Sequence, residues 1–259
     1  MSDRRLERKV ELDASPEQVW DATGPGISAW FVPNFVPNEV EPRAGGASTQ
    51  RFGGGFDVTG RVTAWEPGKR FAYGSAEPPT ERADFAFDLL VEGRDGGGTV
   101  LRFVQSGFLD GGWEGEYDSL DRGWDLFFHN LRSYLEHFAG RPVQNALTTA
   151  FIPGRAAEIW PVLHTALGLA GHPAVGETVT LRPEGPEPVT GVVDVASPEF
   201  LGVRSAHGLH RIGAEGDAGC GVSAHHYFYG EPVDEEAITA AWQSWLAALF
   251  PPAVDTGAL

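Results

Sequence analysis

The sequence contains a single cysteine, Cys220, among 259 residues. One thiol excludes an internal disulfide and any metal site built from several cysteines. No stretch of about 20 consecutive apolar residues occurs, so the sequence predicts no membrane-spanning helix. The start, MSDRRLERK, is not followed by the apolar segment of a secretory signal, and we therefore expect a cytoplasmic protein.

Basic residues are also scarce. Lys and Arg number 19 against 36 Asp and Glu, which gives a formal net charge of −17. Proteins that bind nucleic-acid phosphates or anionic lipids need clusters of positive charge, and the sequence has no basic run of that kind. We therefore expect no nucleic-acid partner and no membrane partner, and we attribute the acidity to solubility.

Several catalytic and nucleotide-binding motifs are missing. The sequence has no Gly-x-Ser-x-Gly elbow, no phosphate-binding loop and no dinucleotide fingerprint. Pro67 and Gly68 fit a turn between strands. We therefore assign no cofactor, and whether the protein is an enzyme stays open.

The sequence does contain an abrupt change from a strand pattern to a helix pattern. Residues 6–13 place Leu6, Arg8, Val10 and Leu12 on one face and Glu7, Lys9, Glu11 and Asp13 on the other, as a half-buried strand does. Ser15 and Gln18 then match the capping box of a helix start, and Pro16 fits the first helical position. The segment ISAWF at 27–31 predicts a second, short helical piece after a Gly-Pro-Gly break.

Strand patterns continue to residue 109 and are followed by one long helix. In DFAFDLLVE, residues 85, 87, 89 and 91 are apolar and share a face, and RDGGGT connects this strand to VLRFVQSGF. Trp124, Phe128, Leu131 and Leu135 then form one stripe of a helix that Gly140 closes. This order predicts an α+β fold with the helices on one side of an antiparallel sheet.

The remaining residues repeat the first part in the same order. SPEQVW (15–20) matches RAAEIW (155–160), and GRVTAWEP (60–67) matches GVVDVASP (191–198). VLRFVQSGF corresponds to VSAHHYFYG, and WDLFFHNL (124–131) corresponds to WQSWLAAL (242–249). We therefore predict two tandem domains, 1–142 and 145–252, with the junction near residues 139–146.

The first copy resembles a known family through ELDASPEQVWDATGPGISAWFVP, GRVTAWEPGKRFAY, GTVLRFVQSGF and the helix WEGEYDSLDRGWDLFFHNLRSYLEHF. These segments are similar to the SRPBCC, or START-like, proteins. The subgroup is the one that resembles the C-terminal domain of the activator of the heat-shock-protein-90 ATPase. The resemblance implies the helix-grip fold, in which a curved antiparallel sheet wraps around a long C-terminal helix, often with an apolar cavity between them.

The second copy resembles a degenerate version of the same fold. It has Ala156 where the first copy has Pro16, and it lacks the WF.P element formed in the first copy by Trp30, Phe31 and Pro33. We therefore expect the first copy to hold the binding site.

Large aromatic side chains are the main candidates for such a site. Rings that line a cavity accept a flat apolar ligand at little cost in conformational entropy, whereas the alternative is that they simply fill the core. The candidates in the first copy are Trp30, Phe31, Phe56, Trp65, Phe71, Phe85, Phe87, Phe103, Phe108, Trp113, Trp124 and Phe128.

Titratable residues give weaker signals. Glu114, Glu116 and Asp118 lie close together before the long helix, which fits a solvated acidic turn better than an acid–base pair. His207 and His210 are three apart in a strand-like segment and His225 and His226 are adjacent, so each pair should point to opposite faces. We therefore assign no metal site. Cys220 fits a small buried thiol better than a nucleophile.

Three functions remain open at this stage. The main hypothesis is binding of a hydrophobic small molecule without catalysis. The alternatives are a polyketide cyclase or aromatase, since the wider superfamily includes such enzymes, and a co-chaperone that activates an ATPase. The eukaryotic activator has an additional N-terminal domain that these tandem copies do not resemble. The sequence leaves both a monomer and a homodimer open.

Overall fold

A computed structural model describes residues 5–24, 26–32, 39–51, 57–75, 86–106 and 113–251. The chain divides into two compact units, Met1–Gly140 and Arg141–Leu259. None of the helices described is both long enough and apolar enough to cross a bilayer.

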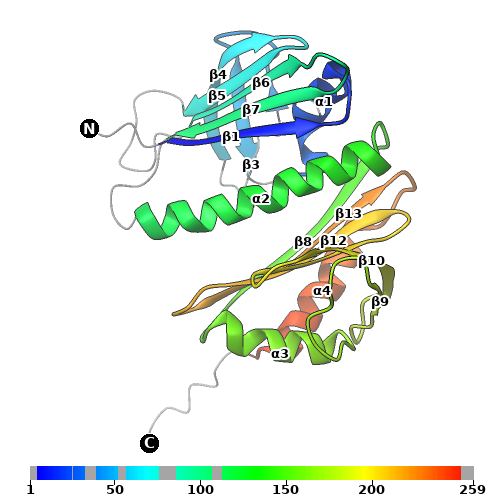
Figure 1. Cartoon of the computed structure of the whole chain (residues 1–259). Coiled ribbons are helices and arrows are strands. Elements are labelled where there is room, and N and C mark those ends of the chain that lie inside the picture. Colours follow the sequence, from blue (N-terminus) through cyan, green and yellow to red (C-terminus); the bar gives the residue numbers. More distant parts are fainter. Residues whose placement is uncertain are drawn as a thin grey trace, which may run out of the picture. The chain divides into compact units, whose positions relative to one another are not determined.

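The first unit is one seven-stranded antiparallel sheet with its helices (Figure 1). Its strands lie in the order β1-β7-β6-β5-β4-β3-β2, so the first strand pairs with the last. In chain order the elements are β1 (Arg5–Leu12), α1 (Pro16–Thr23), the 3₁₀ turn η1 (Ile27–Ala29), β2 (Glu39–Val40), β3 (Ala47–Arg51), β4 (Asp57–Glu66), β5 (Arg70–Ser75), β6 (Ala86–Gly93), β7 (Thr99–Ser106) and α2 (Trp113–His137).

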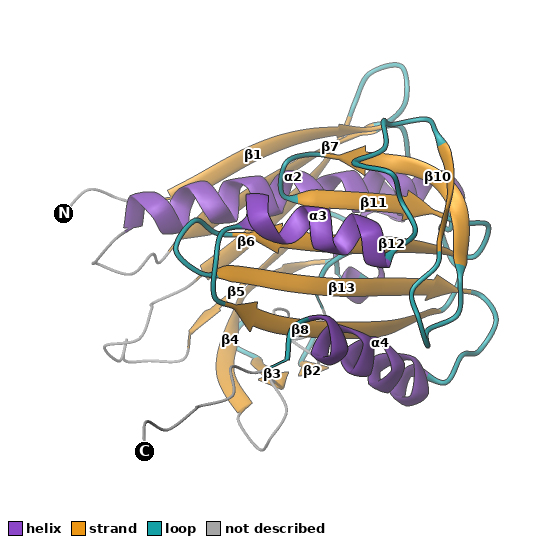
Figure 2. Cartoon of the chain, turned by 90° about the horizontal axis from the view of Figure 1, so that it is seen from below, coloured by secondary structure: helices purple, strands orange, loops and turns teal. Residues whose placement is uncertain are grey.

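The second unit is a six-stranded antiparallel sheet in the order β8-β13-β12-β11-β10-β9. Helices α3 and α4 lie against the same face of this sheet (Figure 2), where both contribute to its apolar core. In chain order the elements are β8 (Val143–Ile152), α3 (Ala156–Ala166), β9 (Thr178–Leu181), β10 (Val189–Ala196), β11 (Phe200–Arg204), β12 (Gly208–Glu215), β13 (Cys220–Tyr229) and α4 (Glu235–Leu249).

The two units have the same topology. Each runs strand, helix, a meander of antiparallel strands and a final helix, and each pairs its first strand with its last. The second sheet differs by having no counterpart of β2 within residues 141–251. The α+β helix-grip fold in two tandem copies, predicted from the sequence, is therefore confirmed, and all four matched segment pairs fall on equivalent elements.

A shared irregularity supports the same duplication. The pairing of β4 with β5 shifts register between Val62 and Ala64, and that of β10 with β11 shifts between Val193 and Val195. The sequence match places Val62 on Val193. A β-bulge bends its strand locally and is inherited as a feature of a fold, so its recurrence at matched positions is not expected of unrelated sheets.

The turn before β3 and β9 also recurs. Gly45 has φ 77° and Gly176 has φ 93°, a backbone conformation that favours glycine. The Gly45 amide donates to the Val62 carbonyl, and the Gly176 amide donates to the Val193 carbonyl, both at 2.8 Å. This match was not recognised in the sequence, because the segments around the two glycines otherwise differ.

The first helices of the two units begin differently. The Gln18 amide donates to Ser15 Oγ at 3.2 Å, and the Ser15 amide donates to Gln18 Oε1 at 3.0 Å. These two bonds are the predicted capping box. In α3 only the second half survives, since the Arg155 amide donates to Glu158 Oε2 at 3.1 Å and no N-cap side chain accepts a bond.

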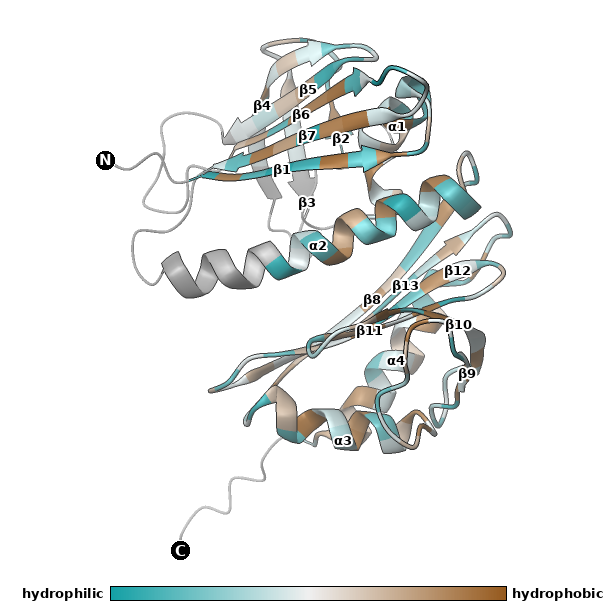
Figure 3. Ribbon diagram, viewed as in Figure 1, coloured by the Kyte–Doolittle hydropathy of each residue, from teal (hydrophilic) through white to brown (hydrophobic). Residues whose placement is uncertain are grey.

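Apolar residues follow the faces that each element buries. In β7, Val100, Leu101 and Phe103 are buried while Arg102 is exposed, and the alternation is visible in Figure 3. In α4, Trp242, Trp245 and Leu246 are buried against the second sheet. Helix and sheet thus enclose one core per unit, as a two-layer architecture requires.

Candidate functional site

The described aromatic candidates of the first unit form one packed network. Trp30, Phe31, Phe71, Phe103, Trp124 and Phe128 are each less than 5% exposed, whereas Trp65 and Phe87 are half-buried. The Trp124 ring is the centre of the network. Its centroid lies 4.0 Å from that of Phe103, 4.7 Å from that of Phe31 and 5.3 Å from that of Phe128.

The network continues along the sheet toward α1. Phe87 stacks on Tyr73, Tyr73 on Phe71, and Phe71 meets Trp65 edge-on, with centroids 5.1 to 5.3 Å apart. Sequence reasoning missed Tyr73 and also Trp20, which packs on Trp65. In this network the rings pack on one another, and the ligand-binding role predicted for them stays a prediction.

Some of the predicted residues cannot be placed in this network. Phe56, Phe85 and Phe108 lie outside the described residues, and so does the side chain of Trp113. Glu114, Glu116 and Asp118 belong to the first turns of α2, which begins at Trp113, rather than to a turn before it. The prediction was wrong on this point, because the helix starts before its apolar stripe does.

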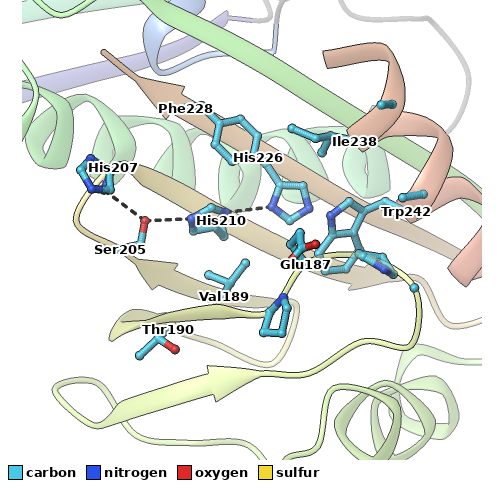
Figure 4. Close-up of a pocket in the computed structure, with 15 residues that line it drawn as sticks. Glu187, Val189, Thr190, Ser205, His207, His210, His226, Phe228, Ile238 and Trp242 are labelled. Carbon is cyan, nitrogen blue, oxygen red and sulfur yellow. Dashed lines mark hydrogen bonds between the residues drawn. The ribbon is translucent and has the colours of Figure 1, made fainter. Parts of the chain in front are cut away.

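A pocket of about 530 Å³ lies in the second unit (Figure 4). Its walls come from the loop before β10, the turn between β11 and β12, the strands β12 and β13, and α4. Apolar side chains dominate the lining, with Val189, Phe228, Ile238 and Trp242 prominent. This volume falls within the range of about 300–1,000 Å³ typical of small-molecule sites.

A chain of three polar side chains runs through the pocket wall. Ser205 Oγ lies 3.0 Å from His210 Nε2, and His210 Nδ1 lies 3.0 Å from His226 Nδ1 (Figure 4). The backbone amide of His207 also donates to Ser205 Oγ, at 3.3 Å. His210 and His226 meet because they are directly paired across β12 and β13.

The two histidines are neutral around pH 7. Burial is the main cause that lowers the pKa of His210, to about 3, and the Arg211 charge lowers it further. Burial also lowers the pKa of His226 well below its usual value, with His210 and His225 adding to the effect. A neutral imidazole has one donor and one acceptor nitrogen. Each histidine can therefore donate one hydrogen bond and accept another.

The last nitrogen of this series of hydrogen bonds makes no bond to a described residue. His226 Nε2 is buried and has no hydrogen-bond partner among the described residues. The His226 ring is 1% exposed and lies between Phe228 and Trp242, with its centroid 4.3 Å from that of Trp242 (Figure 4). Buried polar groups normally have partners, so this atom calls for an explanation.

The predictions for the histidines were partly correct. His225 and His226 point to opposite faces as expected, because His225 Nε2 bonds to Asn145 Oδ1 at 3.2 Å on the far side of the sheet from α4. His207 and His210 were expected to diverge but line the same pocket. The reason is that His207 belongs to the turn before β12, where strand alternation does not apply.

Two other expectations can be compared with the structure. Within the described residues no group of three or more His, Cys, Asp or Glu side chains is placed to hold a metal ion. Cys220 is fully buried in the apolar core of the second unit. Burial raises the pKa of its thiol, which disfavours the reactive thiolate.

The two units differ in the side chains along one row of paired positions that crosses each sheet. In the first sheet, Leu6, Gln105, Phe87, Tyr73 and Val62 are paired side by side across five strands. The equivalent row of the second sheet is Ala146, His226, His210, Val203 and Val193. We call these two sets the cross-sheet rows. The second row carries the smaller side chains Ala146, His210 and Val203 where the first has Leu6, Phe87 and Tyr73, and of these three His210 lines the pocket.

A comparison with known protein families finds one match, which lies in the first unit. Residues 13–136 match the family model described as "Activator of Hsp90 ATPase homolog 1-like protein". The matched residues make up most of the first unit. A search of curated proteins finds no match to the chain.

Three solved structures are similar to this chain at low sequence identity. The solution structure of the Aha1 dimer from Colwellia psychrerythraea is 20% identical, covers 51% of this chain and 96% of its own, and has a TM-score of 0.40. The di-domain ARO/CYC BexL of the BE-7585A biosynthetic pathway is 14% identical, with 95% and 94% coverage and a TM-score of 0.42. DynU16, from the dynemicin biosynthetic locus, is 20% identical, with 95% and 98% coverage and a TM-score of 0.40.

Proposed function

We propose that this protein binds a small, mainly apolar molecule in the pocket of the second unit. The observation that carries the proposal is the pocket itself, a hollow of about 530 Å³ between strands β12 and β13 and helix α4. Its wall combines apolar side chains with a few convergent polar groups, which is the usual composition of a ligand site. We assign no catalysis to it.

The electrostatics of the pocket favour an uncharged ligand. No Lys or Arg occurs among the lining residues, all of which lie within the described range 141–251, and Glu187 is exposed on the lining. A buried ligand charge would therefore lack an opposite charge, and burying an unpaired charge is costly.

Ligand-dependent thermal stabilisation of the full chain tests the proposal. A ligand that binds only the folded state raises the melting temperature by an amount that grows with the logarithm of its concentration divided by its Kd. A panel of neutral lipophilic compounds should contain members that stabilise the protein. Ala241→Phe, which fills the pocket from α4, should remove that stabilisation.

The neighbouring residue provides a matched control. Ala240 is exposed on the same helix and does not line the pocket, so Ala240→Phe should keep the ligand response. If no compound stabilises the unmodified chain, or if the response survives Ala241→Phe unchanged, the second-unit pocket is not the binding site.

A further inference from the structure

The pocket wall of the second unit contains a buried polar atom that bonds to no described residue, His226 Nε2. The His226 ring lies beside the rings of Phe228 and Trp242, which also line the pocket. Leaving such a group unsatisfied is costly relative to a bonded one. A ligand that supplied a hydrogen bond at this point would remove that cost.

The hydrogen bonds among Ser205, His210 and His226 allow His226 Nε2 to be either a donor or an acceptor. In one arrangement Ser205 donates to His210 Nε2, His210 Nδ1–H donates to His226 Nδ1, and His226 Nε2 then carries a proton and is a donor. In the other, Ser205 donates to the Gly208 carbonyl, 3.4 Å away. His210 Nε2–H then donates to Ser205, His226 Nδ1–H donates to His210, and His226 Nε2 is an acceptor. Both arrangements satisfy the same two contacts of 3.0 Å without creating a charge.

We propose that the pocket binds a ring-bearing apolar molecule with an uncharged hydroxyl or carbonyl group, and that His226 Nε2 forms the hydrogen bond to that group. This inference rests on the proposed function, since it names the class of ligand for the same pocket. The rings of Phe228 and Trp242 contact the body of the molecule. Because Nε2 is covered, the ligand reaches it through a small shift of the wall, where Trp242 is the neighbouring ring.

Three naphthalene probes of similar shape test the inference on the full chain. 2-Naphthol offers a donor, 2-acetylnaphthalene offers an acceptor, and 2-ethylnaphthalene offers neither. Both polar probes should bind about tenfold more tightly than 2-ethylnaphthalene, which corresponds to one buried hydrogen bond. His226→Phe should bring all three dissociation constants together, whereas His137→Phe, in the first unit, should leave the preference unchanged.

The ring protonation of His226 gives a second measurement that needs no variant. Long-range ¹H–¹⁵N spectra distinguish which imidazole nitrogen carries the proton. His226 should be protonated on Nε2 in the 2-acetylnaphthalene complex and on Nδ1 in the 2-naphthol complex. If neither probe changes the Nε2 resonance of His226 from that of the ligand-free protein, the inference is overturned, because no hydrogen bond then forms at that atom.

The possible failures are distinct. If all three probes bind with equal affinity, or if His226→Phe keeps the preference for the polar probes, the role of His226 is refuted while the proposed function stands. If none of the three binds and the lipophile panel also gives no stabilisation, the proposed function itself fails and the inference fails with it.

Discussion

Gln105 in the first unit and His226 in the second occupy the same position in their sheets. Each lies beside the first strand of its unit, and each contacts the buried tryptophan of the last helix. Trp124 Nε1 donates to Gln105 Oε1 at 2.7 Å, whereas the Trp242 ring packs on the ring of His226. Gln105 is therefore hydrogen-bonded to Trp124 among packed aromatic rings, whereas His226 lines a pocket.

This contrast predicts the effect of truncating a ring in the first unit. Phe103 lies two residues before Gln105, where the second unit has Ala224 two residues before His226. Phe103→Ala should destabilise the first unit by about 3–5 kcal/mol, because it removes a ring that packs on Trp124 and leaves a cavity. Urea denaturation measures the loss. Val104→Ala, on the opposite face of β7, should cost about 1 kcal/mol, and an equal loss in the two variants would contradict the packed core.

A buried ion pair on the other face of the second sheet should be important for stability. Arg211 Nη1 and Nη2 donate to the two carboxylate oxygens of Asp194 at 2.8 and 2.9 Å, and the two side chains are only 3% and 10% exposed. Asp194→Ala leaves the Arg211 charge buried without this partner and should cost about 3–5 kcal/mol in denaturant unfolding.

An exposed ion pair provides the comparison for this prediction. Lys69 Nζ lies 3.2 Å from Glu66 Oε2, with both side chains largely in solvent. Lys69→Ala should change stability by about 0.5 kcal/mol or less. If Asp194→Ala had an effect as small as this, the buried pair would not contribute as inferred.

The helix caps give a prediction for the first unit. Ser15→Ala removes the side-chain acceptor for the Gln18 amide and should lower stability by about 1 kcal/mol. Arg155→Ala in the second unit should have a smaller effect, because Arg155 offers no side-chain acceptor to α3. Melting temperatures of the two variants measure the difference, and the reverse ranking would be inconsistent with the observed caps.

Acid should destabilise the second unit through its buried histidines. Burial lowers the pKa of His210 and of His225 to about 3 and lowers that of His226 well below its usual value. Below pH 6.5 the unfolded chain therefore binds protons that the folded chain excludes, so stability falls as the pH falls toward 3. Each such histidine contributes about 1.4 kcal/mol per pH unit in this window.

Denaturation at pH 7.5 and at pH 5.5 measures this dependence. His225→Gln should show a smaller loss between the two values than the unmodified chain, because one of the three histidines no longer takes up a proton on unfolding. Gln can also replace the bond to Asn145. An identical pH dependence in both proteins would show that His225 does not remain neutral in the fold.

Local sequence patterns were sufficient to predict the elements and their duplication. The capping box at Ser15, the alternation in β1 and β6 and the stripe of α2 depend on neighbours a few residues apart, so the sequence displays them directly. The repeat was recognised for the same reason, because equivalent elements keep their apolar pattern. The strand match was one residue out of register, however, since pairing aligns Leu101, rather than Val100, with Val222.

The sequence by itself determined the helix-grip fold, its two copies and the aromatic set of the first unit. Only the tertiary structure decided where a pocket lies, because free space depends on the summed volumes of side chains from β10, β12, β13, their loops and α4. Ser205, His210 and His226 are separated in the chain, and antiparallel pairing brings them together. In the second unit His210 and His226 of the cross-sheet row line a pocket beside Trp242, whereas the described rings of the first unit pack on one another.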